Sequence, residues 1–172
     1  DFPIKNNTSQ LSPYLARGEL SVNEIFFSIK KKKNKIKSYD YNKFTAQLGW
    51  REFSYNILYN FPNLSSKNFI SKFDNFPWKK NEANFQKWRD GNTGFPIVDA
   101  GMRELKATGY MHNRLRMIVA SFLVKNLNIS WVFGAKWFWE NLFDADVANN
   151  FAGWQWVAGC GTDAAPYFRI FN

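Results

Sequence analysis

The stretch HNRLRMIVASFLVKNL (residues 112–127) carries the strongest structural pattern in this chain of 172 residues. Its apolar residues recur three and four positions apart, which is the spacing of one face of an α-helix. This apolar stripe consists of Leu115, Ile118, Val119, Phe122 and Leu123. The stripe is wide, so the segment predicts a helix that packs into the core of the domain.

A second face of the same helix has an unusual composition. It combines an amide, a guanidinium, a thioether and a methyl group at relative positions i, i+3, i+4 and i+7, namely Asn113, Arg116, Met117 and Ala120. This mixture suits a wall that contacts something both polar and flat. A partly buried flank between two helices explains the spacing equally well.

Outward from this helix, helical spacing is frequent and strand signals are weak. Ser12 is expected to cap a helix with Pro13 as its first residue, Gly18 to end it, and Ser21 to cap the next helix. Further helices are predicted at residues 41–61, 95–109 and 134–143, with long polar loops at about 62–94 and 144–165. The sequence therefore predicts an all-α domain.

The size and composition restrict the class of protein. A chain of 172 residues forms one domain with a sizeable core, and 19% of its residues are aromatic. No apolar run approaches the roughly 18–20 residues of a membrane span. Cys160 is the only cysteine, so no intrachain disulfide can form, and a reducing, intracellular compartment is expected. The start at Asp1 and the end at FRIFN suggest a piece of a larger protein.

The net charge of +9 is concentrated in one place. Six lysines fall in the run KKKKNKIK between Lys30 and Lys37, and without them 17 basic residues face 14 acidic ones. Such a run can steer a polyanion such as nucleic acid. It can also be a solvated loop, and the absence of an aromatic partner within the run favours this second interpretation.

Two further motifs bear chemistry. Asp144 and Asp146 on one short segment are open to three interpretations: a metal site, an acid–base pair, or ion pairing and capping with Arg116 as a partner. With one histidine, His112, and no cysteine cluster, no transition-metal site is predicted. The absence of a GxSxG motif gives no support to a serine nucleophile.

The stretch GWQWVAGCGTDAAPYF (153–168) places small residues behind two tryptophans. Small side chains let the backbone approach a neighbour closely, although a tightly packed turn would use them as well. The small residues are Ala158, Gly159, Gly161, Ala164 and Ala165.

From about Trp78 to Asn172 the sequence resembles the photolyase/cryptochrome family in its FAD-binding helical domain, and it is most similar to class I cyclobutane pyrimidine dimer photolyases. The resemblance rests on KWRDGNTGFPIVDAGMRELKATGYMHNRLRMIVASFLVKNL, LFDADVANN and GWQWVAGCGTDAAPYFRIFN, with weaker matches at TSQLSPYLARGELS and QLGWREF. It implies that residues 1–172 are one FAD-binding, catalytic helical domain. The family's N-terminal α/β domain, which would carry an antenna chromophore, is then absent from this sequence.

The resemblance also implies which residues hold FAD. The segment that contacts the flavin phosphates is expected at Thr8, Ser9, Gln10, Leu11 and Ser12, since hydroxyls and amides before a helix form an anion site. Residues beside the flavin ring and ribose are expected to be Asn113, Arg116, Met117, Asp144, Ala145 and Asp146, with Arg116 and Asp144 as an ion pair. Asn150 is expected to face the flavin N5 atom.

Electron transfer and DNA binding are assigned in the same way. The relay tryptophans are, in order from the flavin, Trp154, Trp131 and Trp78, whereas Trp88, Trp137 and Trp139 are expected in the core. The residues expected to contact a flipped-out pyrimidine dimer and its DNA are Gln47, Trp50, Arg51, Asn113, Arg114 and Trp156. Asn113 stands where the (6-4)-repair branch usually has histidine, which points to cyclobutane dimers.

The resemblance implies a carbon–carbon lyase of the deoxyribodipyrimidine photo-lyase type. Reduced, photoexcited FAD would transfer an electron to a cyclobutane pyrimidine dimer in UV-damaged DNA and split it. A cryptochrome-like blue-light photoreceptor with the same FAD site is the first alternative, and a basic helical DNA-binding protein without flavin is the second. The chain is expected to be a monomer in the cytoplasm of a bacterium, acting on nucleoid DNA without membrane association.

Overall fold

The computed structural model describes residues 8–164 of the chain, and these contain helices but no strand, which confirms the all-α prediction. In chain order the elements are α1 (Ser12–Arg17), α2 (Val22–Lys31), η1 (Lys33–Lys35), α3 (Ser38–Asn60), η2 (Ser71–Phe73), α4 (Glu82–Arg89), α5 (Pro96–Thr108), α6 (Asn113–Ser121), η3 (Phe122–Asn126), α7 (Trp131–Asn141) and α8 (Val147–Ala158). Within the described ranges, none of the helices is both long and apolar enough to cross a membrane.

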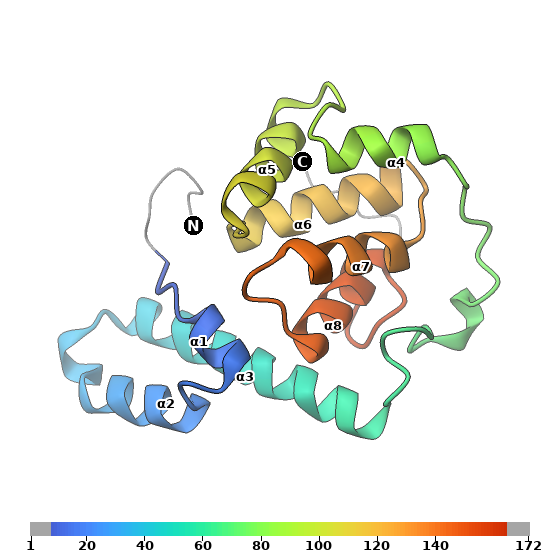
Figure 1. Cartoon of the computed structure of the whole chain (residues 1–172). Coiled ribbons are helices and arrows are strands. Elements are labelled where there is room, and N and C mark those ends of the chain that lie inside the picture. The colour runs from blue at the N-terminus through green and yellow to red at the C-terminus, as the bar shows by residue number, and fades with distance from the viewer. Residues whose placement is uncertain (1–7, 165–172) are drawn as a thin grey trace.

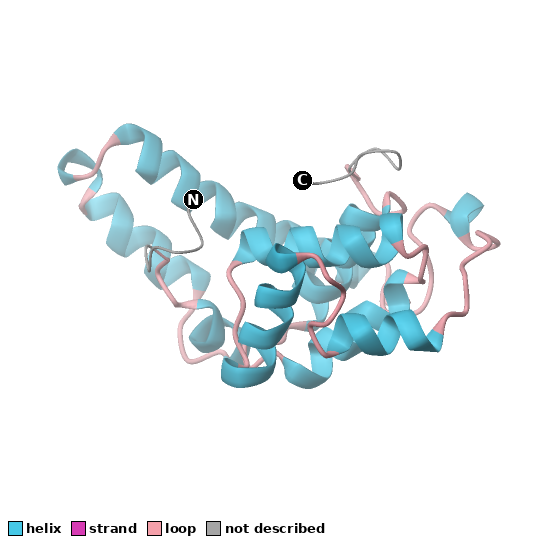
Figure 2. Ribbon diagram, turned by 90° about the horizontal axis from the view of Figure 1, so that it is seen from above, coloured by secondary structure: helices cyan, strands magenta, loops and turns pink. Residues whose placement is uncertain are grey.

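The helices form two groups that meet along α3 (Figure 1). Helices α4 to α8 pack together on one side, while α2 and the first half of α3 form a hairpin that projects on the other side. The view from above shows the same projection (Figure 2). The later part of α3 packs along α8, so α3 joins the hairpin to the main body.

The main body has an aromatic core. Trp88 is fully buried, and its indole Nε1 donates a hydrogen bond to the backbone oxygen of Val119 at 2.9 Å. The ring of Trp154 lies edge-on to Trp88 and Phe138, with centroid separations of 6.1 and 5.0 Å. Trp137 packs against this core as expected, but Trp139 is 44% exposed, so its placement in the core was wrong.

The apolar stripe of the 112–127 segment is confirmed. Four of its five residues are buried in the core and Ile118 packs against them. The helix is less regular than predicted, because α6 ends at Ser121 and continues as the π-helical turn η3. The Leu127 N–H donates to Phe122 O at 3.1 Å, the i→i+5 bond of such a turn, which inserts an extra residue without interrupting the buried stripe.

Local capping follows the sequence closely. The Ser21 hydroxyl accepts from the Glu24 N–H and the Glu24 carboxylate accepts from the Ser21 N–H, which is a capping box at the start of α2. Gly18 and Gly109 end α1 and α5 with φ of 75° and 69°, values that favour glycine. Ser12 is not a cap, however. Helix α1 begins at Ser12, one residue earlier than predicted, and Pro13 takes its second position. A proline fits there because the N–H groups of the first turn have no partner within the helix.

The two predicted long loops both contain a helix. The 144–165 segment forms α8, whose N-cap Asp146 accepts from the Asn149 N–H at 2.9 Å. The buried residues of α8 do not form one stripe along the helix, so the sequence of this segment shows no clear helical period. The 62–94 segment contains α4, which is capped by Asn81 and buries Phe85 and Trp88.

Candidate functional site

A cavity of about 500 Å³ lies where α3, α6 and α8 meet. Its floor and walls include residues from the α7–α8 connection and from the segment after α8. The lining contains twelve of the residues that the family resemblance assigns to FAD, electron transfer or DNA: Gln47, Trp50, Arg51, Asn113, Arg116, Met117, Asp144, Ala145, Asp146, Asn150, Trp154 and Trp156. Residues nearly 120 positions apart in the chain therefore share one site.

The mixed face of α6 forms one wall of this cavity. Asn113, Arg116, Met117 and Ala120 all line it. Helix α8 contributes Gly153 among other residues, and a Cβ atom added there would meet no atom within 4 Å. The cavity thus combines polar groups on α6 with open space next to the backbone of α8.

A buried ion pair stands at one side of the cavity. The Nη2 atom of Arg116 lies 3.0 and 2.9 Å from the two carboxylate oxygens of Asp144, and its Nε donates to Met111 O at 2.7 Å. The Asp144 side chain is only 2% exposed and that of Arg116 24%. A carboxylate this deeply buried needs such a partner, so ion pairing is the interpretation of Asp144 that the geometry supports.

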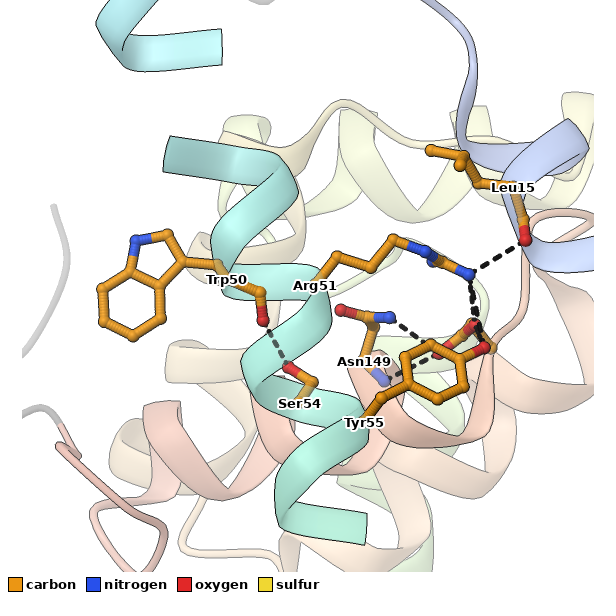
Figure 3. Close-up of polar contacts among 7 residues, drawn as sticks. Leu15, Trp50, Arg51, Ser54, Tyr55 and Asn149 are labelled. Carbon is orange, nitrogen blue, oxygen red and sulfur yellow. Dashed lines mark hydrogen bonds and ion pairs between the residues drawn. The ribbon is translucent and has the colours of Figure 1, made fainter. Parts of the chain in front are cut away.

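Asp146 lies at the centre of a second polar network, and Figure 3 shows its partners Arg51, Tyr55 and Asn149. One of its oxygens, Oδ2, accepts from Arg51 Nη2 at 2.8 Å and from the Tyr55 hydroxyl at 2.5 Å. The other oxygen accepts from the backbone N–H and the side-chain amide of Asn149 at 2.9 and 2.7 Å. Arg51 Nη2 also donates to Leu15 O at 3.0 Å, so the network joins α1, α3 and α8.

The network shifts the ionisation of its members. Burial would raise the pKa of Asp146, but hydrogen bonds from Tyr55 and Asn149 and the charge of Arg51 together hold it below its ordinary value. Burial and the hydrogen bond to Asp146 raise the pKa of Tyr55 to about 12. Asp146 is therefore an ionised cap and ion-pair partner. No group of three or more His, Cys, Asp or Glu residues between positions 8 and 164 is arranged to hold a metal.

Sequence reasoning missed Tyr55. Its hydroxyl reaches Asp146 from α3, and its ring lies 5.2 Å from the guanidinium of Arg51. The available signal was its position four residues after Arg51, which puts both side chains on one face of a helix.

Trp154 requires a small neighbour at a place that the sequence did not indicate. A Cβ atom added to Gly134 on α7 would lie 2.2 Å from Cη2 of Trp154, so only glycine allows this packing. Among the small residues after Trp156, Gly161 also makes a close approach, since its added Cβ would lie 3.0 Å from the Gln155 backbone. Ala165, of the same run, lies outside the described residues.

Gln155, between the two tryptophans, has a structural role. It is fully buried, and its amide nitrogen donates to the backbone oxygens of Leu64 and Lys67 at 2.8 and 2.9 Å. Its oxygen accepts from the Phe69 N–H at 2.8 Å. Three hydrogen bonds thus fix the segment after α3 to α8 and orient the helix that carries both tryptophans.

The three expected relay tryptophans line two pockets of the main body. Trp154 lines the cavity, while Trp131 is 1% exposed and donates from Nε1 to Asn68 Oδ1 at 2.8 Å. Trp131 and Trp78 together line a second pocket of about 360 Å³. Trp131 begins α7 and Gly134, beneath Trp154, lies one turn further along the same helix.

Other expected site residues are placed as follows. Asn150 donates its amide to Ala135 O at 2.8 Å, which orients its side chain at the cavity wall. Arg114 is exposed and is not part of the lining. The lining also excludes the segment before and at the start of α1, which comprises Thr8, Ser9, Gln10, Leu11 and Ser12. Phe53 does line the cavity and pairs with Trp50 at a centroid separation of 5.7 Å, but sequence reasoning did not select it.

Comparison with known proteins places this fold and cavity in context. Residues 44–172 match the model of the FAD binding domain of DNA photolyase. The chain is 54% identical, over all of its 172 residues, to the deoxyribodipyrimidine photo-lyase of Agrobacterium fabrum, of which it covers 36%. It covers 36% of the crystal structure of a bacterial class III photolyase from Agrobacterium tumefaciens, with 99% of this chain aligned, 53% identity and a TM-score of 0.96.

A cryptochrome structure is similar as well. The Synechocystis cryptochrome aligns with 96% of this chain at 41% identity and a TM-score of 0.89, and 34% of that chain is covered. The chain belongs to the family of FAD-binding domains of DNA photolyases. It spans a little over a third of the length of the curated relatives that it matches.

Proposed function

We propose that this chain binds FAD in the cavity and supports light-driven repair of cyclobutane pyrimidine dimers in DNA. The observation that carries the proposal is the cavity itself. The cavity brings the buried Arg116–Asp144 pair and Trp154 together with Trp50 and Trp156, two aromatic residues that are more exposed than Trp154. The family match and photo-lyase relatives at 44–54% identity support the same function.

The donor set of the cavity fits a flavin. Arg116 and Asp144 together offer a donor and an acceptor that are mutually fixed, and Asn113 adds an amide on the same wall. Met117 and Ala120 supply an apolar surface beside them, and Gly153 leaves room for a flat ring close to the backbone. Pockets for cofactors have this composition, mostly apolar with a few placed polar groups.

The residues of the chain bind and orient, while the cofactor supplies the electron. When bound and photoexcited, reduced FAD would supply the electron that splits the dimer. Arg116 and Asp144 would hold the polar edge of the flavin, and Asn150 would offer a neutral amide beside it. The Arg51–Asp146–Tyr55 network would keep α8 fixed against α3, so that the wall of the site does not move.

The DNA side of the site is assigned to the aromatic residues at the cavity mouth. Trp50 is 52% exposed and pairs edge-on with Phe53, and Trp156 lines the cavity from α8. Stacking of a base on an aromatic ring stabilises the complex by roughly 1–3 kcal/mol. Gln47 offers an amide that can hydrogen-bond a thymine edge, and Arg114 an exposed charge for a phosphate.

The relay tryptophans give a prediction of their own. Trp131→Phe should retain FAD but abolish light-driven reduction of the oxidised flavin by an external thiol, because an indole between Trp154 and Trp78 is removed. Repair should persist when the flavin is reduced chemically. The measurement is flavin absorbance during blue illumination. The exposed Trp139→Phe serves as the control, and equal photoreduction in both variants would disprove the relay assignment.

The proposed function is tested with an oligonucleotide that carries one cyclobutane dimer. A visible absorption spectrum of the purified protein first shows whether flavin is bound. Blue light should then restore the dimer to two thymines when the flavin is reduced, and darkness should not. Trp156→Ala should reduce affinity for damaged DNA more than for undamaged DNA, whereas Trp139→Ala should change neither.

Each negative outcome identifies a different error. Absence of flavin from the purified protein favours a DNA-binding role without a cofactor. Bound flavin that undergoes photoreduction without dimer repair favours the photoreceptor function, which the cryptochrome among the structural neighbours represents.

The cellular setting stays a prediction. A cytoplasmic location accords with the single, unpaired and buried Cys160 and with relatives such as the Agrobacterium protein. Monomeric state is to be measured by gel filtration coupled to light scattering.

A further inference from the structure

The lysine-rich run lies at the far end of the α2–α3 hairpin. Six exposed lysines occupy the end of α2, the turn η1 and the N-cap of α3: Lys30, Lys31, Lys32, Lys33, Lys35 and Lys37. Figures 1 and 2 show this turn projecting away from helices α4–α8. None of these lysines forms an ion pair with another residue of the 8–164 range. The turn is therefore a concentrated, uncompensated positive charge.

The structure also places aromatic rings beside the lysine turn, and the Lys33 ammonium lies 5.4 Å from the centre of the Tyr41 ring. Tyr39 is 71% exposed, and the Lys43 ammonium lies 5.6 Å from the centre of its ring. Tyr39 and Lys43 are four residues apart on α3, and Gln47 and Trp50 continue the series at i+8 and i+11. These spacings place all four side chains along one face of the helix.

This stripe runs from the lysine turn into the cavity. Gln47 and Trp50 line the cavity, whereas Tyr39 and Lys43 lie beside the turn on the same helix face. Between positions 30 and 43 there are seven lysines and a single acidic residue, Asp40. A polyanion that is engaged at the cavity mouth therefore meets a continuous basic and aromatic path along α3.

We propose that the α2–α3 turn is a second DNA-contacting surface, which binds the phosphate backbone of the duplex on one side of the cavity. At a rise of about 1.5 Å per residue, Lys43 lies about 10 Å and Ser38 about 18 Å from Trp50 along the α3 axis. At about 3.4 Å per nucleotide of one strand, the contacts fall about three to five nucleotides from the base in the cavity.

The inference rests on the proposed function for its ligand, DNA, but not on any chemistry in the cavity. Duplex DNA is favoured over an anionic membrane because the stripe ends in the cavity residues Gln47 and Trp50. A membrane would use the charge of the turn alone. Phosphate contacts also predict the salt slope, which is the slope of log affinity against log salt concentration. Each contact contributes about 0.9 to its magnitude.

The test changes Lys31, Lys32, Lys35 and Lys37 together to Gln in the flavin-loaded protein. Glutamine retains helix propensity, and the side chains are exposed, so the fold is preserved. The matched control removes the same charge elsewhere, by changing the exposed Lys79, Lys80, Lys87 and Lys136 to Gln. The DNA probes carry a dimer next to one end, with the long duplex flank either on its 5′ side or on its 3′ side.

The turn variant should lose affinity for only one of the two probes, because the turn lies on one side of the cavity. With that probe the salt slope should fall by about 1.8 to 3.6, which corresponds to two to four phosphate contacts. The control variant should not distinguish the probes. The preference for damaged over undamaged DNA should stay unchanged in both variants.

Several results overturn the inference. Equal losses on both probes, or equal losses in the turn and control variants, would show that only general charge matters. Unchanged DNA binding together with lost binding to vesicles containing about one third phosphatidylserine would assign the turn to a membrane. Failure of the proposed function is seen separately, as absence of lesion preference in the unmodified protein. In that case the salt slopes of the turn variant and the unmodified protein are compared on undamaged duplex.

Discussion

At the scale of single residues, the Arg116–Asp144 pair is expected to determine whether the cavity retains its ligand. Arg116→Leu leaves the Asp144 carboxylate buried without a partner, which typically lowers the free energy of unfolding by about 3–5 kcal/mol. We expect the lower end of this range because the Arg116 side chain is 24% exposed. The measurements are thermal unfolding and retention of flavin through gel filtration.

The exposed pair between Lys106 and Asp90 is the control for this change. Its side chains are 63% and 42% exposed, so Lys106→Leu should lower the free energy of unfolding much less than Arg116→Leu does. Equal effects of the two substitutions, or undiminished flavin retention in Arg116→Leu, would show that the buried pair has no special role.

Asp146→Asn separates capping from ion pairing. Asparagine caps a helix as well as aspartate does. We therefore expect the free energy of unfolding to fall by about 1–3 kcal/mol at neutral pH, because the charged contacts with Arg51 and Tyr55 are lost. The pKa of Asp146 is lowered in the fold, so its stabilisation is complete above its ordinary pKa of about 4 and is lost as pH falls further. Unfolding should thus show a difference between the two proteins that shrinks below about pH 4. A constant difference down to pH 2 would contradict this account.

At the scale of elements, the contact between α7 and α8 depends on Gly134. Gly134→Ala places a Cβ atom 2.2 Å from the ring of Trp154 and 2.7 Å from Cδ2 of Leu123, so one helix must shift. Overpacking of this kind costs about 1–3 kcal/mol. Thermal unfolding measures the cost, and near-UV circular dichroism reports the displaced tryptophan.

Gly49→Ala on α3 is the matched control. A Cβ atom there meets nothing within 4 Å, and alanine is a better helix former by about 1 kcal/mol. Opposite signs for the two glycines are the expected result. Stabilisation of both would mean that Trp154 can relax without cost.

At the scale of the whole molecule, removal of the flavin should loosen one part of the fold more than the rest. A ligand bound at 100 times its Kd stabilises the native state by about 2.7 kcal/mol. The cavity lies where α3, α6 and α8 meet, while α4 and α5 contribute none of its lining. Hydrogen exchange should therefore accelerate in α8 and the middle of α3 on flavin removal, and much less in α5. Uniform acceleration would indicate that the cofactor stabilises only the global fold.

Spacing and propensity along the chain were enough to predict the features that depend on near neighbours. The stripe of α6, the capping box at Ser21 and the glycine ends of α1 and α5 all involve residues within a few positions of one another, so spacing and propensity predict them. The polar face of α6 was also predictable, because Asn113, Arg116, Met117 and Ala120 share a face whatever the helix packs against. The motifs added the family and its expected site.

The features that join distant segments depend on how the helices pack, and local patterns could not predict them. Helix α8 has no single apolar stripe, since it is surrounded by α3, α6 and α7, and so its pattern resembled a loop. Arg51 and Asp146 are 95 residues apart, and no local pattern pairs them or adds Tyr55. The glycine that Trp154 needs lies on α7 rather than in the small residues that follow it. The helical period alone aligns Tyr39 and Lys43 with Gln47 and Trp50, but only the packing of α3 against α2 and α8 shows that this face leads from the lysine turn to the cavity.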